Sequence, residues 1–191
     1  MGGPTTMDEE SEQTQISEFK SLLEELRKQL LDAQIHFDIW EKLWPTEENV
    51  DVINSYKGFF LPTRNAHLDR FFIKLSNTVD ADPRSPSFYR VLKMLATKAD
   101  LAPTIDVRSL RNRLKKLKDL LRRINQYRNK RAAHWDTDAI ELDSVHVGES
   151  RSLLEELESI YNEINSAHNG NVWSFKISQY RDTDRLLNEL R

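Results

Sequence analysis

Four basic or amide side chains and one histidine stand close together near the middle of the chain. They are Arg128, Asn129, Lys130, Arg131 and, after two alanines, His134. A guanidinium is always charged and can hold a phosphate through two hydrogen bonds. An imidazole titrates near neutral pH and can accept or donate a proton. An amide can orient either group, so this set of side chains suits the binding of a phosphate and the transfer of a proton beside it.

The element that must carry these residues is unusually basic. Between positions 108 and 131 there are eleven Lys or Arg residues and one acid, Asp119, whereas the rest of the chain has seventeen basic and thirty acidic residues. One basic element therefore lies in a protein of net charge −3. We predict a single helix from a cap at Asp106 to about Ala133. Its apolar positions alternate steps of four and three, which is typical of a seam against another helix: Leu110, Leu114, Leu117, Leu121 and Ile124.

The next positions of this seam are Arg128 and Arg131. A charge on a packing seam is costly unless it is paired or faces water, so we expect Arg128 at the mouth of a groove or at a contact with a second subunit. Six residues of regular helix turn through about 600°, which separates Arg128 and His134 by about 120°. The two side chains therefore meet only if the helix ends or bends near Ala133, or if they pair between subunits.

Helical periodicity continues through most of the chain. The spacing of apolar residues and the caps predict helices at about 16–44 and 46–56. After expected bends at Gly58 and Pro62, a third helical face contains Leu68, Phe71, Phe72 and Leu75, and helices follow at about 86–102, 106–133, 149–167 and 182–190. Gly170 is a candidate for the residue that closes the sixth of these, and 172–177 alternates like a short strand. The predicted fold class is all-α, an antiparallel helical bundle of four to five main helices plus a short C-terminal helix. We interpret 1–14 as a disordered lead or cloning remnant, and 15–191 as a single domain.

Composition excludes several kinds of site. The chain has no cysteine, which removes disulfides, thiolate metal sites and a cysteine nucleophile. The five histidines do not have the spacing of metal ligands. We therefore predict no metal. Arg64 and His67 lie only three residues apart, which is too close to repeat the arrangement of Arg128 and His134. No stretch approaches the roughly 18 apolar residues of a membrane span, so the expected location is cytoplasmic.

The segment from Arg128 to His134 resembles the defining motif of the HEPN superfamily, the nucleotide-binding domains of higher eukaryotes and prokaryotes. In that motif an Arg, often followed by Asn, precedes a His with four to six residues between, and here five residues separate Arg128 from His134. Within the superfamily the chain most resembles the abortive-infection branch, through Arg64-Asn65-Ala66-His67-Leu68-Asp69 and the following stretch 75–82.

The resemblance implies an endoribonuclease that needs no metal or other cofactor and forms its active site where two subunits of a homodimer meet. Arg128, Asn129 and His134 are then the catalytic residues, and we expect Lys130, Arg131 and Arg123 to contact RNA. Such proteins act in prokaryotic defence or as toxins, so an antitoxin protein is a further candidate partner. In toxins paired with a nucleotidyltransferase antitoxin, a Tyr two residues after the His can be modified, but here that residue is Asp136.

Plainer interpretations stay open at this stage. Arg128 and His134 also fit an exposed helix end, where cations favour the helix dipole. For Arg111, Lys115, Lys118 and Arg122 we expect a solvated outer face, although the one-sided charge of the segment also favours a track for an RNA backbone. The main alternative function is a non-catalytic HEPN-like helical module that binds a partner protein or nucleic acid. A purely structural bundle would leave Arg128 on the seam unexplained.

Overall fold

The computed structural model describes residues 6–133, 146–176 and 182–191, with side chains of the first range described from position 10 to 127. The chain forms eight α-helices and one short 3₁₀-helix, η1, in these ranges. They are α1 (Thr6–Lys42), α2 (Val50–Ser55), α3 (Lys57–Thr78), α4 (Phe88–Thr97), η1 (Ala99–Leu101), α5 (Val107–Lys116), α6 (Lys118–Ala133), α7 (Val147–Asn169) and α8 (Asp182–Glu189).

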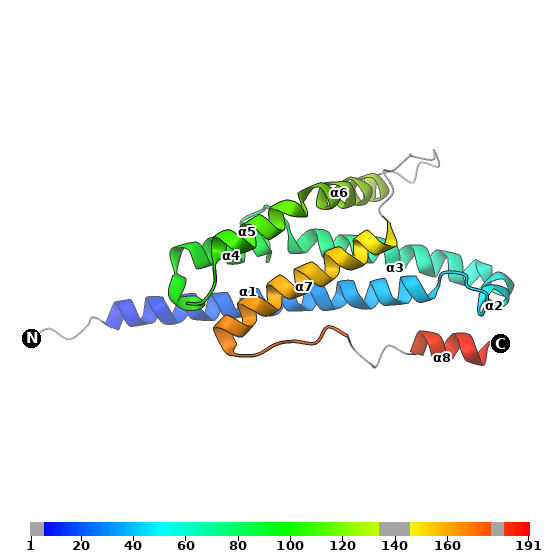
Figure 1. Ribbon diagram of the computed structural model, residues 1–191, viewed down its shortest axis with the longest axis horizontal. Helices are drawn as coiled ribbons and strands as arrows, with labels where there is room; N and C mark the ends of the chain where they lie inside the picture. Colours follow the sequence, from blue (N-terminus) through cyan, green and yellow to red (C-terminus); the bar gives the residue numbers. More distant parts are fainter. Residues whose placement is uncertain (1–5, 134–145, 177–181) are drawn as a thin grey trace, which may run out of the picture.

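The long helices lie side by side with alternating direction (Figure 1). α1 runs through the length of the bundle, and α3 returns along it after the short α2. α5 and α6 then continue in the direction of α1, with α6 on α3 and α5 on α4, and α7 returns along α1. No strand forms in the described parts of the chain. The predicted all-α antiparallel bundle is confirmed.

One continuous core joins these helices. It contains aromatic side chains from four of them, among them Phe19 of α1, Phe71 of α3, Phe88 of α4 and Tyr161 of α7, each at most 2% exposed. Burial of an aromatic or branched aliphatic side chain contributes roughly 1.5–3 kcal/mol, so this cluster supplies most of the driving force for folding. A smaller cluster at the α2 end contains Leu43, Val52, Ile53, Phe60 and Leu187.

The basic segment forms two helices where a single one was predicted. Asp106 caps the first of them as expected, because its Oδ1 accepts hydrogen bonds from the backbone N–H groups of Arg108 (2.9 Å) and Ser109 (3.1 Å). The break falls at Leu117, whose N–H bonds to the carbonyl of Leu114, one residue nearer than in an α-helix. The predicted seam is nevertheless buried on both sides of the break, at Leu110, Leu114, Leu121 and Ile124.

Two further expectations need correction. Residues 6–14, taken as part of a disordered lead, belong to α1, while 1–5 lie outside the described residues. The stretch 172–176 is not a strand, and Ile177 lies outside the description. The backbone of Trp173 in this stretch bonds to a side chain of α7. Asn162 accepts a hydrogen bond from the N–H of Trp173 (2.8 Å) and donates one to its carbonyl (2.9 Å). Phe175 is 4% exposed and packs against Tyr161, whereas Val172 and Trp173 are exposed, so Phe175 is the apolar side chain that attaches this segment to α7.

Two other boundaries also differ from the predictions, because Gly58 and Pro62 lie inside α3 and the helix predicted at 86–102 ends at Thr97, before η1. Gly170 follows α7 with φ of 71°, the left-handed conformation that was predicted to close this helix. The final helix, α8, lies beside the far end of α1, where Asp184 pairs with Lys42. In the part of the chain that is described, no helix has the length and apolar character needed to cross a lipid bilayer.

Candidate active site

The motif lies at the end of α6. The backbones of Arg128, Asn129, Lys130 and Arg131 belong to the last turns of this helix, which is helical through Ala133. His134 lies outside the described residues, as does Asp136, and the side chains of 128–133 are not described either. The meeting of Arg128 with His134 therefore stays a prediction. The structure does define what holds the helix immediately before the motif.

The turn of α6 before the motif is fixed on α3. The hydroxyl of Ser76, which is 2% exposed, donates a hydrogen bond to the side-chain oxygen of Asn125. Two residues further on, the ring of Tyr127 packs against Phe72 with centroids 4.7 Å apart. The hydroxyl of Tyr127 lies 3.4 Å from Oδ1 of Asp69. Because Tyr127 directly precedes Arg128, these contacts set the position from which the motif starts.

A second set of contacts fixes α6 to the start of α7. Arg123 donates two hydrogen bonds to the carboxylate of Glu149, at 2.6 and 3.2 Å. The same carboxylate accepts a bond from the backbone N–H of His146 at 3.1 Å, which caps α7. The guanidinium of Arg123 and then this backbone donor lower the pKa of Glu149 to about 2. Arg123, predicted to contact RNA, thus holds α7 against α6, and its side chain is 18% exposed.

Arg113 of α5 has a similar role on the preceding helix. It donates to Glu156 (2.7 Å), to Glu163 (2.6 Å) and to the hydroxyl of Ser159 (2.9 Å), all on α7. Sequence reasoning treated the basic segment as one charged surface. The partners of Arg113 and Arg123 lie 26 to 50 residues away in the sequence, so no local pattern separates these two arginines from their neighbours.

A histidine pair that sequence reasoning missed lies between α1 and α3. The Nδ1 atoms of His36 and His67 are 2.7 Å apart, so one ring must donate and the other accept. Burial, and then the neighbouring His67 and Arg70, lower the pKa of His36 to about 4. Burial also lowers the pKa of His67. This contact uses the Nδ1 atoms of both histidines to join α1 to α3.

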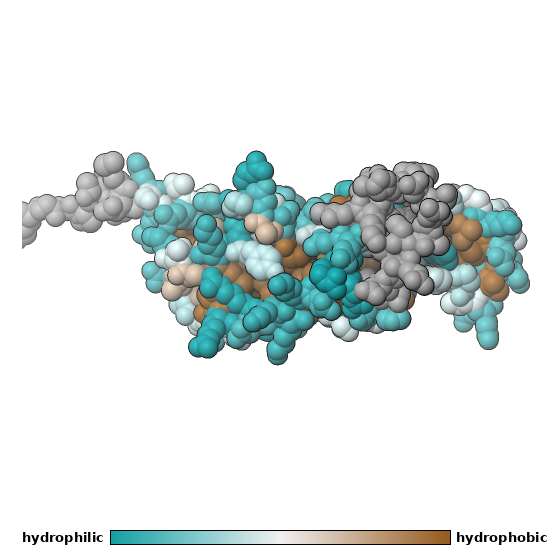
Figure 2. Space-filling view, turned by 90° about the horizontal axis from the view of Figure 1, so that it is seen from above, coloured by the Kyte–Doolittle hydropathy of each residue, from teal (hydrophilic) through white to brown (hydrophobic). Residues whose placement is uncertain are grey.

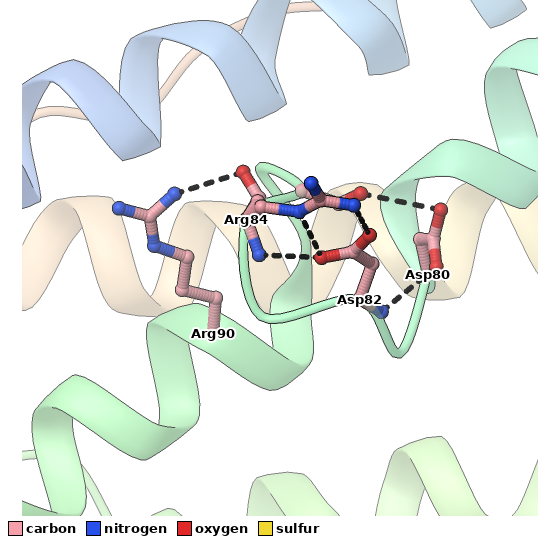
Figure 3. A network of polar contacts seen from close by, with 5 residues as sticks. Asp80, Asp82, Arg84 and Arg90 are labelled. Atoms are coloured by element: carbon pink, nitrogen blue, oxygen red, sulfur yellow. Dashed lines mark hydrogen bonds and ion pairs between the residues drawn. The ribbon is translucent and has the colours of Figure 1, made fainter.

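A groove of about 990 Å³ lies between α1 and the segment joining α3 to α4, and no α6 residue lines it. Beside this groove, polar side chains of the segment joining α3 to α4 bond to one another (Figure 3). Asp82 accepts from the side chain of Arg84 at 2.7 and 3.1 Å, and Arg90 donates to the carbonyl of Arg84 and to Glu18. Asp80 accepts from the backbone of Asp82 and from Ser85. These bonds hold the segment in place, and the groove's size alone assigns it no chemistry.

Metal binding finds no support in the described residues. Within them, no three His, Asp or Glu side chains gather closely enough to hold a metal ion.

The sequence was compared with known protein families, curated proteins and solved structures. The family model described as AbiU2, of the HEPN type, matches residues 16–187, which is most of the chain. No curated protein and no solved structure gives a significant match. The match begins within α1 and ends within α8, so it includes the helices that hold α6 in place. On this match, the chain belongs to the AbiU2 family of HEPN domains.

Proposed function

We propose that this protein is a metal-independent endoribonuclease that acts as a homodimer in prokaryotic defence or as a toxin. The observation that carries the proposal is the Arg128-Asn129-x4-His134 motif at the end of α6 in a HEPN-family chain. The anchoring of α6 by Asn125 and Tyr127 supports it further, because a catalytic group needs a rigid support.

The chemistry follows from the side-chain types. In RNA the ribose 2′-oxygen attacks the adjacent phosphorus, and the bond from phosphorus to the 5′-oxygen breaks. His134 takes the proton from the 2′-hydroxyl or gives one to the leaving 5′-oxygen. Arg128 binds the phosphate oxygens and stabilises the charge that grows on them, and Asn129 orients His134 or the phosphate. The products are a 2′,3′-cyclic phosphate and a 5′-hydroxyl, with no metal required.

The same proposal assigns RNA contacts to Lys130 and Arg131, which follow Arg128 in α6. The proposed RNA contact of Arg123 is restricted, because its guanidinium already donates hydrogen bonds to Glu149. Arg123 contacts a phosphate only through donor groups not used by that carboxylate. An antitoxin is a further proposed partner, for which α6 and the start of α7 are the expected surface because they flank the motif.

Cleavage of labelled RNA in EDTA tests this function. The wild type should cleave, whereas Arg128→Ala and His134→Ala should be at least about 100-fold slower, as expected for loss of a general acid–base or an electrostatic group. Lys57→Ala, an exposed residue at the start of α3, is the matched control and should cleave normally. An RNA with a 2′-deoxy sugar at the cleavage site should resist the wild type.

The outcomes separate the two candidate functions. Loss of cleavage in both variants, with dimerisation intact, establishes the two residues. A dimeric wild type that leaves several RNAs intact, tRNA included, would favour the non-catalytic binding module. Full activity in both variants would exclude Arg128 and His134 as the catalytic pair.

A further inference from the structure

The basic residues of α5 and α6 divide into two faces. Arg113 and Arg123 point inward to acids of α7, as described above. The opposite face has basic side chains that are exposed, and we call this set the outer basic row: Arg108, Arg111, Lys115, Lys118 and Arg122. Figure 2 looks onto the side of the molecule formed by α4, α5 and α6, and hydrophilic side chains project along it.

The row follows the helical repeat. Steps of three and four residues bring side chains onto one face, and the row advances by three, four, three and four. From Arg111 to Arg122 the rise is about 16 Å. The same steps lead on through Gln126, which is exposed, to position 129 in the backbone of the motif. The charged row therefore ends at Arg122, about two helical turns (roughly 10 Å) before position 129, and points toward the candidate active site.

Little within the described structure neutralises this row. Asp119 is the one acid between positions 108 and 131, and it accepts a hydrogen bond from Arg122. Arg122 also donates to Gln126 at 3.2 Å. Lys115 and Lys118 form no ion pair among the described residues, and Arg111 makes a single 3.5 Å contact to the carbonyl of Leu92. A row of evenly spaced cations is the arrangement that a polyanion with regularly spaced phosphates satisfies.

The row has no exposed ring on which a base could stack. Tyr127, at the motif end of the row, packs against Phe72 and is part-buried. Stacking on aromatic side chains is the usual means of holding unpaired bases. The outer basic row therefore offers contacts to phosphates and not to bases, and it would bind RNA without regard to sequence.

We propose that the outer basic row binds the phosphate backbone of the RNA that flanks the cleavage site, so that the substrate extends along α6 and α5 away from the motif. The inference rests on the proposed ribonuclease function for the position of the cleavage site, but the binding itself does not require cleavage. Arg111, Lys115 and Lys118 each contact a phosphate, and Arg113 and Arg123 hold α7.

Binding to the full chain carrying His134→Ala, so that RNA stays intact, tests the proposal. The probe is a fluorescently labelled single-stranded RNA of about 20 nucleotides, titrated at several salt concentrations. The test variant combines Arg111→Gln, Lys115→Gln and Lys118→Gln. The control combines Lys20→Gln, Lys57→Gln and Lys98→Gln, which are exposed basic residues on other elements, so that both triples change the net charge equally.

We expect the test triple to weaken binding roughly 10- to 50-fold near 0.15 M salt and to reduce the slope of log K against log salt by about 2, because each phosphate contact on a single strand contributes about 0.7. The control triple should keep the slope. An RNA of about four nucleotides should bind both triples equally, since it covers only the motif.

Equal affinities and slopes for the two triples would overturn the proposal, whether or not the wild type cleaves RNA. Loss of binding in the test triple alone supports it, even if the wild type proves inactive, in which case only the ribonuclease proposal fails. If the row binds vesicles of phosphatidylserine while RNA binding is unchanged in the test triple, the partner is a membrane surface and the proposal is wrong.

Discussion

At the scale of single residues, hydrogen-bond partners decide what each charged group does. Arg113 and Arg123 have the same side chain as Arg111 and Arg122, yet the first two hold α7 and the others face solvent. An exposed ion pair contributes little to stability, whereas a bidentate arginine contact that is shielded from solvent contributes more. We therefore expect Arg123→Ala to loosen α7 at its start, beside the motif.

The histidine pair leads to a prediction about pH. His36 has a pKa of about 4 in the folded chain and an ordinary value of 6.5. Between these two pH values the folded state binds fewer protons than the unfolded state. The stabilisation of the fold by the histidine pair is therefore fully present above about pH 6.5 and is lost as the pH falls toward 4. Between pH 7 and 4.5 the wild type should lose about 1 kcal/mol more stability than His36→Gln, after allowance for solvent screening.

Urea unfolding of both proteins at each pH measures this difference. An equal loss of stability in the two proteins would mean that His36 and His67 do not exclude a proton from the α1–α3 contact. Activity assays at the same pH values would show whether any pH effect on cleavage comes from folding or from His134.

At the scale of elements, local chemistry sets where helices begin and end. Asp106 starts α5 and Gly170 closes α7, both as the sequence predicts. The break between α5 and α6 is different, because Leu117 is a good helix former and nothing in its local sequence requires a stop. Leu114 and Leu121 are buried on either side of the break, so the break is compatible with packing of both helices on the core.

Gly170 offers a prediction with an internal control. Its φ of 71° is strained for any residue with a Cβ, and a Cβ added there would touch nothing within 4 Å, so strain is the whole effect. Gly170→Ala should lower the free energy of unfolding by about 1 kcal/mol. Gly148 lies in the first turn of α7 with equally open surroundings. Gly148→Ala should raise it by up to about 0.5 kcal/mol, because alanine favours helix.

Thermal or urea unfolding of the two variants separates conformational strain from helix propensity. If both substitutions destabilised equally, the left-handed closure of α7 would not be the cause. If Gly170→Ala had no effect, α7 would have to end in another way in solution.

At the scale of the whole molecule, the proposed active site raises the question of which subunit supplies each group. Arg128 lies within α6, and His134 follows it by six residues, with α6 helical through Ala133. On a continuous helix the two positions face directions about 120° apart, which disfavours their meeting within one subunit. In the proposed two-fold dimer, the Arg128 of each chain would instead pair with the His134 of the other.

Mixing subunits tests this arrangement. If the site is shared between subunits, inactive Arg128→Ala and inactive His134→Ala chains should regain roughly a quarter of wild-type cleavage when refolded together, because half of the dimers are mixed and each mixed dimer has one intact site. Mixing wild type with the double variant is the control for subunit exchange. No recovery, with exchange demonstrated, would place both groups in one subunit.

The sequence by itself determined the helical class, the seam of α5 and α6, the two helix caps and the motif of the HEPN family, because helix periodicity, caps and short motifs are all local. The tertiary structure alone decided which basic residues turn to α7, that His36 meets His67, that α5 breaks from α6, and that 172–176 packs as an extended segment bonded to Asn162. These features depend on partners far along the chain, and the spacing of neighbouring residues does not specify such partners.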